Sequence, residues 1–387
     1  MRHHPTAIPS AWPIAGGHIG VALVVGTLAH AGVARHVTGL ARALGTGRHR
    51  VHLYVLSDAG EPAVRLRGLG IPATLLPRRH SYEPARILAL ARVFKRDGID
   101  VVHAILPAGA AYGALAARLA GVPIVVSSRA GDPREDRHVR SVLRRLYRGA
   151  TLVLANTRAQ ARLVAEETGI AVERVPVVYD GADLAAASMP GVLEGLRDRV
   201  WHRRPLIGGA GSPATGRALF YAAAGRIAAR RPDVQFVWLA EGNDVGAGEL
   251  PSDLPVTIVP AGDDALPVLS ELALLCLTDG PECPSIGLAS AAMAAGRPVV
   301  AGLVPGIDEL VEDGTTGAVV PSADAEALAA AALGLLEDRG RLRTLGYAAR
   351  SRAEQVLGVE GMARATAALY EASLLGAIGG PAGAVSR

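Results

Sequence analysis

The chain has 387 residues, of which half are hydrophobic but only 4% aromatic. This length allows two domains that each bury a core, and the scarcity of aromatic rings argues against a stacking platform for nucleic acid. The two cysteines, Cys276 and Cys283, provide no disulfide framework, which favours a reducing cytoplasm. No apolar run reaches the roughly 18 residues that a membrane-spanning helix needs.

Charge is divided unevenly along the chain. Residues 1–190 contain 24 Arg and Lys against 13 Asp and Glu, a net charge of +11, and the remainder carries −7. This asymmetry predicts that the first half meets an anionic substrate or surface. Nucleic acid is the alternative target, but no nucleic-acid-binding motif accompanies the charge, so we expect no such partner.

The N-terminal part begins with residues 1–17, which contain three prolines and no apolar signal core and are predicted to form a disordered extension. An apolar strand over Ile19–Val25 then leads through a glycine-bearing turn into a helix from about Val33 to Leu44. Strand, glycine turn and helix form the unit that commonly holds a phosphate. Gly32 is the candidate residue, although a tight turn alone would also explain a glycine there.

Short apolar runs alternate with helical segments through the rest of the first half. Strands are predicted at Val51–Leu56, Asp100–Leu106, Pro123–Ser127, Thr151–Ala155 and Val175–Tyr179, with helices near 62–69, 84–97, 108–120, 135–149 and 157–168. Such alternation is typical of a parallel, doubly wound sheet, here over residues 18–183.

The segment 134–148 is an amphipathic helix with six arginines. Its apolar residues recur every three or four positions, and a separate stripe consists of Arg137, Arg140, Arg144 and Arg148. The stripe is either an ordinary solvated face or a contact for an anionic membrane surface. Both interpretations stay open at this point.

A second α/β series follows a connection over residues 184–204. Strands are predicted at Pro205–Gly208, Val234–Leu239, Val256–Val259, Ala273–Leu277, Pro298–Ala301 and Gly317–Val320, with helices near 215–231, 264–272, 285–295, 306–312, 323–336, 339–356 and 360–375. These elements predict a second domain over 205–359, a final helix over 360–376 and a tail over 377–387.

The stretch from Asp279 to Val320 is the most informative part of the chain. Ser285 follows Pro284 directly and is a good N-cap for the small-residue helix that ends near Ala295. A helix that starts beside a loop directs free backbone N–H groups and a partial positive charge ahead of it, where a phosphate often binds. An ordinary helix cap is the alternative interpretation.

Two runs in this stretch, Ala292–Val300 and Pro305–Pro321, strongly resemble the donor-binding domain of the retaining family 4 glycosyltransferases. Tyr179-Asp-Gly-Ala-Asp183 also resembles a signature that closes the first domain in that family. The resemblance extends from about Ile19 to Tyr370. It implies the GT-B fold: two Rossmann-like, doubly wound parallel-sheet domains that face a central cleft, with the last helix crossing back to the first domain.

The resemblance implies a function as well as a fold. We expect a cytoplasmic glycosyltransferase, with membrane association on the cytoplasmic face left open. It would move a sugar from a nucleotide diphosphate sugar, with retention, to a glycan or lipid-linked acceptor in polysaccharide or glycoconjugate biosynthesis. An enzyme that resembles this family needs no cofactor and no metal.

The resemblance also implies roles for individual residues. On the acceptor side it points to His103 and Arg129, and Arg129 stands where the family often has a histidine. Arg129 and Glu282 are the candidate catalytic residues. The candidate donor-binding residues are Gly32, Gly209, Gly211, Thr215, Ser285, Ile286, Ser290 and Glu309.

Four positions depart from the family pattern. Ala210 and Thr215 stand where the family has an arginine and a lysine, and Cys283 and Ala291 stand where it has two glutamates. Losing two cationic contacts to a phosphate would cost roughly 10²- to 10⁴-fold in affinity or rate. A catalytically inactive glycosyltransferase-like binding or scaffold protein is therefore the alternative. An epimerase or hydrolase on the same fold has no positive feature in the sequence.

Overall fold

The structure is a computed structural model that describes residues 17–29, 31–57, 60–76, 83–128, 137–188, 204–212, 215–240, 254, 256–260, 265–280 and 285–376. Except for Gly17, the predicted extension over 1–17 lies outside these residues, as do the tail over 377–387 and most of the connection over 184–204.

The first sheet is built from the N-terminal half of the chain. Its strands are β1 (Ile19–Val25), β2 (His49–Val55), β3 (Ala73–Leu75), β4 (Val101–Ile105), β5 (Ile124–Ser128) and β6 (Leu152–Ala155). In the described residues they lie in the order β3-β2-β1-β4-β5-β6, and every pairing is parallel. The helices of this half are α1 (Ala31–Gly45), α2 (Gly60–Gly68), α3 (Pro84–Arg96), α4 (Leu106–Ala120), α5 (Arg137–Arg148) and α6 (Arg158–Thr168).

Strand β1 shows why this sequence forms a sheet covered on both faces. All seven of its residues are buried, and successive side chains point to opposite faces. Val21 and Leu23 join a core that includes residues of α1, whereas Ala22 and Val24 join a second core with residues of α3 and α4. A strand that is apolar on both faces needs helices on each side, as in doubly wound folds.

The second sheet repeats this arrangement. Its strands are β7 (Leu206–Gly211), β8 (Gln235–Ala240), β9 (Val256–Pro260), β10 (Leu274–Thr278), β11 (Val299–Gly302) and β12 (Gly317–Val320). Within the described residues their order is β12-β11-β10-β7-β8-β9, again with parallel pairing throughout. The helices are α8 (Thr215–Arg230), α9 (Ala265–Glu271), α10 (Ile286–Ala294), α11 (Ala325–Glu337) and α12 (Arg339–Val356). Two cores cover its two faces. The prediction of two doubly wound parallel sheets is confirmed.

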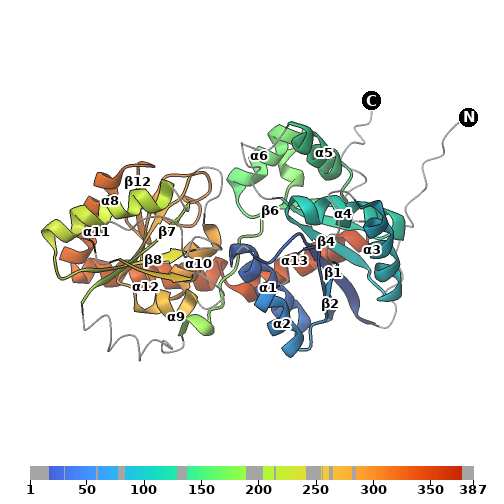
Figure 1. Cartoon of the computed structure of the whole chain (residues 1–387), viewed down its shortest axis with the longest axis horizontal. Coiled ribbons are helices and arrows are strands. Elements are labelled where there is room, and N and C mark those ends of the chain that lie inside the picture. The colour runs from blue at the N-terminus through green and yellow to red at the C-terminus, as the bar shows by residue number, and fades with distance from the viewer. Residues whose placement is uncertain are drawn as a thin grey trace, which may run out of the picture.

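The last helix, α13 (Val359–Leu374), returns from the second domain to the first (Figure 1). It packs against α1, and its Val359, Met362 and Tyr370 belong to the core of the first sheet. Where the chain re-enters, Ala182 and Gly358 form a parallel backbone bridge. The end of the first domain and the start of α13 are therefore joined by main-chain hydrogen bonds, Ala182 N to the Leu357 carbonyl and Val359 N to the Ala182 carbonyl.

Two predicted elements differ from the structure, and one strand of the structure was not predicted. Val175–Tyr179 is not a strand, since only Val177 forms an isolated bridge to Ala155. The short strand β3 was not predicted, and its Leu75 is exposed. The predicted helix near 306–312 consists of turns, because the loop is held by contacts with the first domain that are described below.

Candidate active site

The strand order gives the second sheet a switch point between β7 and β10, and we call the space at the carboxyl ends of these two strands the crevice. Strands β7 and β10 are neighbours in the sheet but not in sequence, and their following helices, α8 and α10, begin at the same edge. Parallel sheets bind ligands at the carboxyl ends of the strands beside such a switch point. The residues at these ends are Gly211 on β7 and Thr278 on β10, which pair directly in the register.

Close packing at this edge leaves room only for glycine at two positions. A Cβ atom on Gly211 would lie 2.6 Å from the backbone of Thr278, and one on Gly216, in the first turn of α8, would lie 2.3 Å from the Thr278 carbonyl oxygen. Real Cβ atoms do not approach backbone atoms so closely. These glycines therefore let the start of α8 lie against the end of β10.

Hydrogen bonds fasten the loop after β7 to the loop after β10. The Thr278 hydroxyl donates to the Ala210 carbonyl at 3.1 Å, and the amide of Gly280 donates to the hydroxyl oxygen of Ser212, also at 3.1 Å. Ser212 is half-buried, and Thr215 is exposed at the start of α8. Two neutral hydroxyl groups therefore lie at this edge of the sheet, on or beside the first turn of α8.

The N-terminus of α10 is capped by a carboxylate of the chain itself. Asp279 accepts hydrogen bonds from the backbone amide of Ser285 at 2.7 Å and from its hydroxyl at 2.9 Å. Ser285 precedes the helix as expected, but its side chain makes no cap hydrogen bond to the helix. A negative charge at a helix N-terminus is stabilising. The sequence predicted that an anion, such as a phosphate, binds ahead of this helix. At the amide of Ser285 the carboxylate of Asp279 occupies that place.

The next residues of α10 have different surroundings. Ile286 is buried in the domain core, whereas a Cβ atom on Gly287 would meet no described residue within 4 Å. Among the residues that the structure describes, the first turn of α10 is therefore open at Gly287. Helix α1 of the first domain contacts α10, and Gly32, in the first turn of α1, is half-buried. The crevice thus lies where the two domains meet.

The loop after β11 forms a second contact between the domains. Glu309 accepts hydrogen bonds at 2.7 Å from the backbone amides of both Arg158 and Ala159, the first two residues of α6. The hydroxyl of Tyr179 donates to Glu309 at 3.0 Å. Burial, together with this hydrogen bond, raises the pKa of Tyr179 above its usual value. Both carboxylate oxygens of Glu309 are thus engaged by the first domain.

Four predicted site residues have other roles in the structure. Gly209 lies inside β7, and a Cβ atom there would lie 2.4 Å from the ring of Phe220. A glycine at this position therefore lets the Phe220 ring pack against β7. The fully buried Ser290 hydroxyl donates to the Ile286 carbonyl at 3.1 Å. Glu309 bridges the domains, as described above. The side-chain hydrogen bonds of Ser290 and Glu309 are thus made within the protein, and the assignment of all three as donor-binding residues stays a prediction.

His103 is the fourth. It is completely buried in β4, and its Nδ1 lies 2.6 Å from the hydroxyl of Tyr370 on α13. Burial lowers its pKa to about 3, so the ring is neutral at physiological pH. His103 joins the returning helix to the first sheet from a fully buried position, and its assignment to the acceptor side stays a prediction.

The two candidate catalytic residues, Arg129 and Glu282, lie outside the described residues, as does Cys283. Of the other replaced positions, Ala210 is 1% exposed and belongs to the core of the second domain. The alanine methyl group at 210 packs in that core and offers no charge to the crevice. Ala291 is likewise buried in that core. Gly32, Gly211, Thr215, Ser285 and Ile286 lie at or beside the crevice, and their roles as donor-binding residues stay predictions.

Sequence reasoning missed Asp279, Thr278 and Gly216. Asp279 stands between a buried strand and a helix cap, and that pattern could have indicated a capping carboxylate. In the part of the chain that the structure describes, no group of three or more His, Cys, Asp or Glu residues could hold a metal ion. None of the described helices is long and apolar enough to cross a membrane.

Comparison with known proteins agrees with this geometry. The model of "Glycosyltransferase Family 4" matches residues 30–186, and that of "Glycosyl transferases group 1" matches residues 205–338. A phosphatidyl-myo-inositol mannosyltransferase of Mycolicibacterium smegmatis is 28% identical over 335 residues, which cover 83% of this chain and 84% of that protein. A D-inositol 3-phosphate glycosyltransferase of Paenarthrobacter aurescens is 26% identical, covering 82% of this chain and 88% of that protein.

Solved structures show the same fold. The crystal structure of Alr3699/HepE from Anabaena, in complex with UDP and glucose, superimposes with a TM-score of 0.77 at 20% identity, covering 92% of this chain and all of that one. This likeness shows that the chain shares the fold of that structure over most of its length. The predicted resemblance is therefore confirmed: the chain belongs to glycosyltransferase family 4, with the GT-B fold, and is a glycosyltransferase.

Proposed function

We propose that the protein transfers a sugar, with retention, from a nucleotide diphosphate sugar that binds in the crevice between α8 and α10. The observation that carries this proposal is the edge at Gly211 and Thr278, where two helices begin beside open space at Gly287. The UDP and glucose named for the Anabaena structure support a donor of this class. The enzyme would work in the cytoplasm, without a metal ion or cofactor.

For this transfer, groups in the crevice must stabilise the leaving nucleoside diphosphate. Negative charge grows on that group in the transition state, and preorganised N–H and O–H donors there lower the barrier. The hydroxyls of Ser212 and Thr215 and the first-turn amides of α8 and α10 can supply such donors. In a retaining transfer that follows the family pattern, the leaving phosphate itself takes the acceptor proton, so the site needs no separate base.

The proposed acceptor carries a phosphate and is lipid-linked. The two relatives named above are, by name, a phosphatidyl-myo-inositol mannosyltransferase and a D-inositol 3-phosphate glycosyltransferase, so both names combine inositol with phosphate. The net charge of +11 over residues 1–190 suits an anionic acceptor. Any product would enter a glycolipid or another glycoconjugate.

A membrane surface on the first domain supports the lipid-linked acceptor. Helices α4 and α5 contact each other and expose the apolar side chains of Leu115, Leu119 and Val142. The described arginines of α5, Arg144, Arg145 and Arg148, are also exposed, and Arg148 donates to the Thr168 carbonyl. Exposed apolar residues next to a row of arginines suit the interface of an anionic bilayer. The side chains of Arg137 and Arg140, which complete the predicted stripe, lie outside the described residues.

A transfer assay tests the proposal. The protein would be incubated with UDP- and GDP-linked hexoses and with either inositol phosphate or phosphatidylinositol vesicles. Mass spectrometry would then detect the product, and NMR would give its anomeric configuration. We expect a product that keeps the anomeric configuration of the donor. An inverted product would refute retention, and a neutral glycan as the preferred acceptor would refute the phosphate-bearing acceptor.

One observation favours the inactive, nucleotide-binding alternative. Asp279 places a carboxylate on the amide of Ser285, and a negative charge there disfavours a second anion at the same amide. Calorimetry with UDP separates the two functions. Binding without turnover of any donor would support a binding protein, whereas binding with release of the diphosphate supports the transferase.

Vesicle flotation tests the membrane surface independently. Arg144→Glu combined with Arg145→Glu should abolish salt-sensitive flotation with anionic vesicles, because each arginine near such a surface contributes about 1 kcal/mol. The matched control is Arg339→Glu combined with Arg341→Glu on exposed positions of α12, in the other domain. Equal flotation of both double variants would contradict a membrane contact through Arg144 and Arg145.

A further inference from the structure

A second cavity lies in the C-terminal domain, away from the crevice. It has a volume of about 380 Å³, and its wall includes Ala273 and Pro298, which stand directly before β10 and β11. The donor crevice is at the carboxyl ends of the strands, so this pocket lies at the opposite edge of the same sheet. Its volume is within the range of about 300–1,000 Å³ that is usual for small-molecule sites.

The charged residues that line the pocket are all arginines. Arg343 and Arg350 come from α12 and Arg297 from the turn between α10 and β11, and none of the described residues that line the pocket is acidic. Arg343 is exposed and has no hydrogen bond or ion pair to any residue that the structure describes. Three guanidinium groups around one cavity attract an anion, and a guanidinium is well shaped for a phosphate.

The pocket has a fixed frame. Arg350 donates to the carbonyls of Ala294 and Leu184, and its Nε lies 2.6 Å from Glu354. Arg297 is half-buried and donates to the Ser270 carbonyl. A Cβ atom on Gly346 would lie 2.4 Å from the Gly296 carbonyl oxygen, so a glycine there lets α12 lie close to the turn. Preorganised walls of this kind reduce the entropy lost when a ligand binds.

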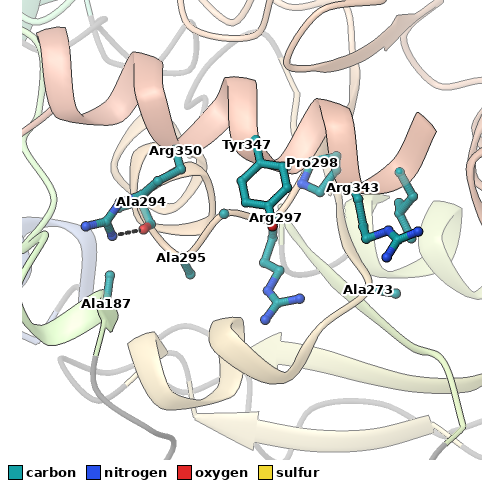
Figure 2. A pocket seen from close by; sticks show the side chains of 12 residues that line it. Ala187, Ala273, Ala294, Ala295, Arg297, Pro298, Arg343, Tyr347 and Arg350 are labelled. Atoms are coloured by element: carbon teal, nitrogen blue, oxygen red, sulfur yellow. Dashed lines mark hydrogen bonds between the residues drawn. The ribbon is translucent and has the colours of Figure 1, made fainter. Parts of the chain in front are cut away.

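An aromatic ring stands at the mouth of the pocket. Tyr347 is 77% exposed, the largest value among the exposed large hydrophobic side chains of the described residues. Figure 2 shows Arg350, Tyr347 and Arg343 in this order along α12, with Arg297 on the adjacent turn and its side chain extending away from α12. An exposed aromatic ring beside cations is costly to leave in water and offers a flat surface for a sugar or base.

We propose that this pocket binds a small phosphate monoester that carries a ring, a sugar phosphate or a nucleoside monophosphate. The phosphate pairs with the arginines, above all Arg343, and the ring lies against Tyr347. The site is separate from the donor crevice. It is also lined by Ala187, at the start of the connection between the domains, and its Arg350 donates to the nearby Leu184 carbonyl. Bound ligand therefore contacts the segment through which the two domains are joined.

A fluorescent reporter tests the site directly. Tyr347→Trp places an indole at the mouth of the pocket, and glucose 6-phosphate, uridine monophosphate and inorganic phosphate are titrated in turn. We expect the emission to change with either ring-bearing phosphate, with an affinity at least about tenfold higher than for inorganic phosphate. Neutral glucose and uridine should give no change at the same concentrations.

Calorimetry on variants with the native tyrosine supplies the second readout. Arg343→Gln should weaken binding of glucose 6-phosphate by about tenfold or more, since a charge-assisted hydrogen bond is lost. Arg341→Gln is the matched control, because Arg341 is exposed on the same helix but does not line the pocket. The control should bind as the wild type does, and both variants should unfold at the wild-type temperature.

Three results would overturn the proposal. They are no binding of either ring-bearing phosphate, equal affinity for inorganic phosphate, and equal affinity of Arg343→Gln and Arg341→Gln. Release of nucleoside diphosphate from a donor depends on the other edge of the sheet. A negative result in the binding experiments therefore does not contradict the proposed transferase function. A negative result in the transfer assay does not contradict phosphate binding in the pocket.

Discussion

The carboxylate of Glu309 in the second domain accepts a hydrogen bond from the hydroxyl of Tyr179 in the first domain, at 3.0 Å. The same carboxylate caps α6 through the amides of Arg158 and Ala159. A loop that follows β11 therefore fixes the relative position of the two domains on one side of the crevice. The returning helix α13 does so elsewhere, through Tyr370 and His103.

Glu309→Gln should weaken the domain contact. The amide side chain carries no charge for the N-terminus of α6 and has one acceptor oxygen in place of two. We expect a loss of about 1–3 kcal/mol in the free energy of unfolding, measured by denaturant titration. Glu312→Gln is the control, since Glu312 is an exposed acid in the same loop that pairs with Arg352. Equal losses in the two variants would contradict a special role for Glu309.

His103 should make stability depend on pH. Burial lowers its pKa to about 3, whereas the unfolded chain regains the usual value of about 6.5. As pH falls below about 6.5 the unfolded state binds a proton that the folded state refuses, so stability declines by about 1.4 kcal/mol per pH unit. The decline continues until the folded pKa is reached.

The His103→Gln variant isolates that contribution. Its free energy of unfolding, measured between pH 7 and pH 4, should fall less steeply than that of the wild type by about this slope. Other partly buried histidines, His49 and His52, have lowered pKa values through burial and leave a residual slope. An unchanged slope in His103→Gln would show that the ring is protonated in the folded state.

Gly209→Ala separates packing from ligand binding. The added methyl group meets the ring of Phe220, so we expect a loss of about 1–3 kcal/mol in stability. The folded variant should still bind UDP within about twofold of the wild-type affinity, because Gly209 lies inside β7. Gly334→Ala, in α11 with nothing near its added methyl, should instead stabilise by about 0.4–1 kcal/mol. Loss of UDP affinity without loss of stability would restore Gly209 to the donor site.

Thr215→Lys should strengthen donor binding. Thr215 is exposed as the first residue of α8, and a lysine there adds a cation at the edge where the diphosphate is proposed to lie. We expect the dissociation constant for UDP to fall about tenfold, with a stronger dependence on salt. Ala222→Lys adds the same charge at an exposed position about two turns along α8 and should leave the dissociation constant for UDP unchanged. Equal effects of the two lysines would indicate long-range attraction alone.

The sequence predicted the sheets well because their strands are short apolar runs between helical segments. Ile19–Val25 is predicted with the bounds that the structure shows, since all of its residues are buried. Strand β3 has three residues and an exposed end, too little for a periodic signal. The loop near 306–312 has helical composition, but Glu309 bonds to a domain that is distant in sequence, and such contacts are invisible in a local pattern.

Individual site residues were harder to predict for a related reason. A motif gives the place of Ser290 or Gly209 in the chain, but not the direction in which a side chain points. Both proved to be interior positions. The contact between Ser212 and Gly280 joins residues 68 positions apart, and the capping of Ser285 by Asp279 depends on how the loop between them turns. Only the folded sheet brings these groups to one edge.

Release of nucleoside diphosphate from a panel of donor sugars tests the transferase crevice most directly, when the wild type is compared with Gly287→Phe. The added ring enters the open space at the first turn of α10, whereas Gly334→Phe adds it at a position in α11 that is equally open among the described residues. We expect release by the wild type and by Gly334→Phe, and a loss of at least about tenfold in Gly287→Phe. Release by the wild type no faster than without protein, or equal release by all three, would contradict a donor site between α8 and α10.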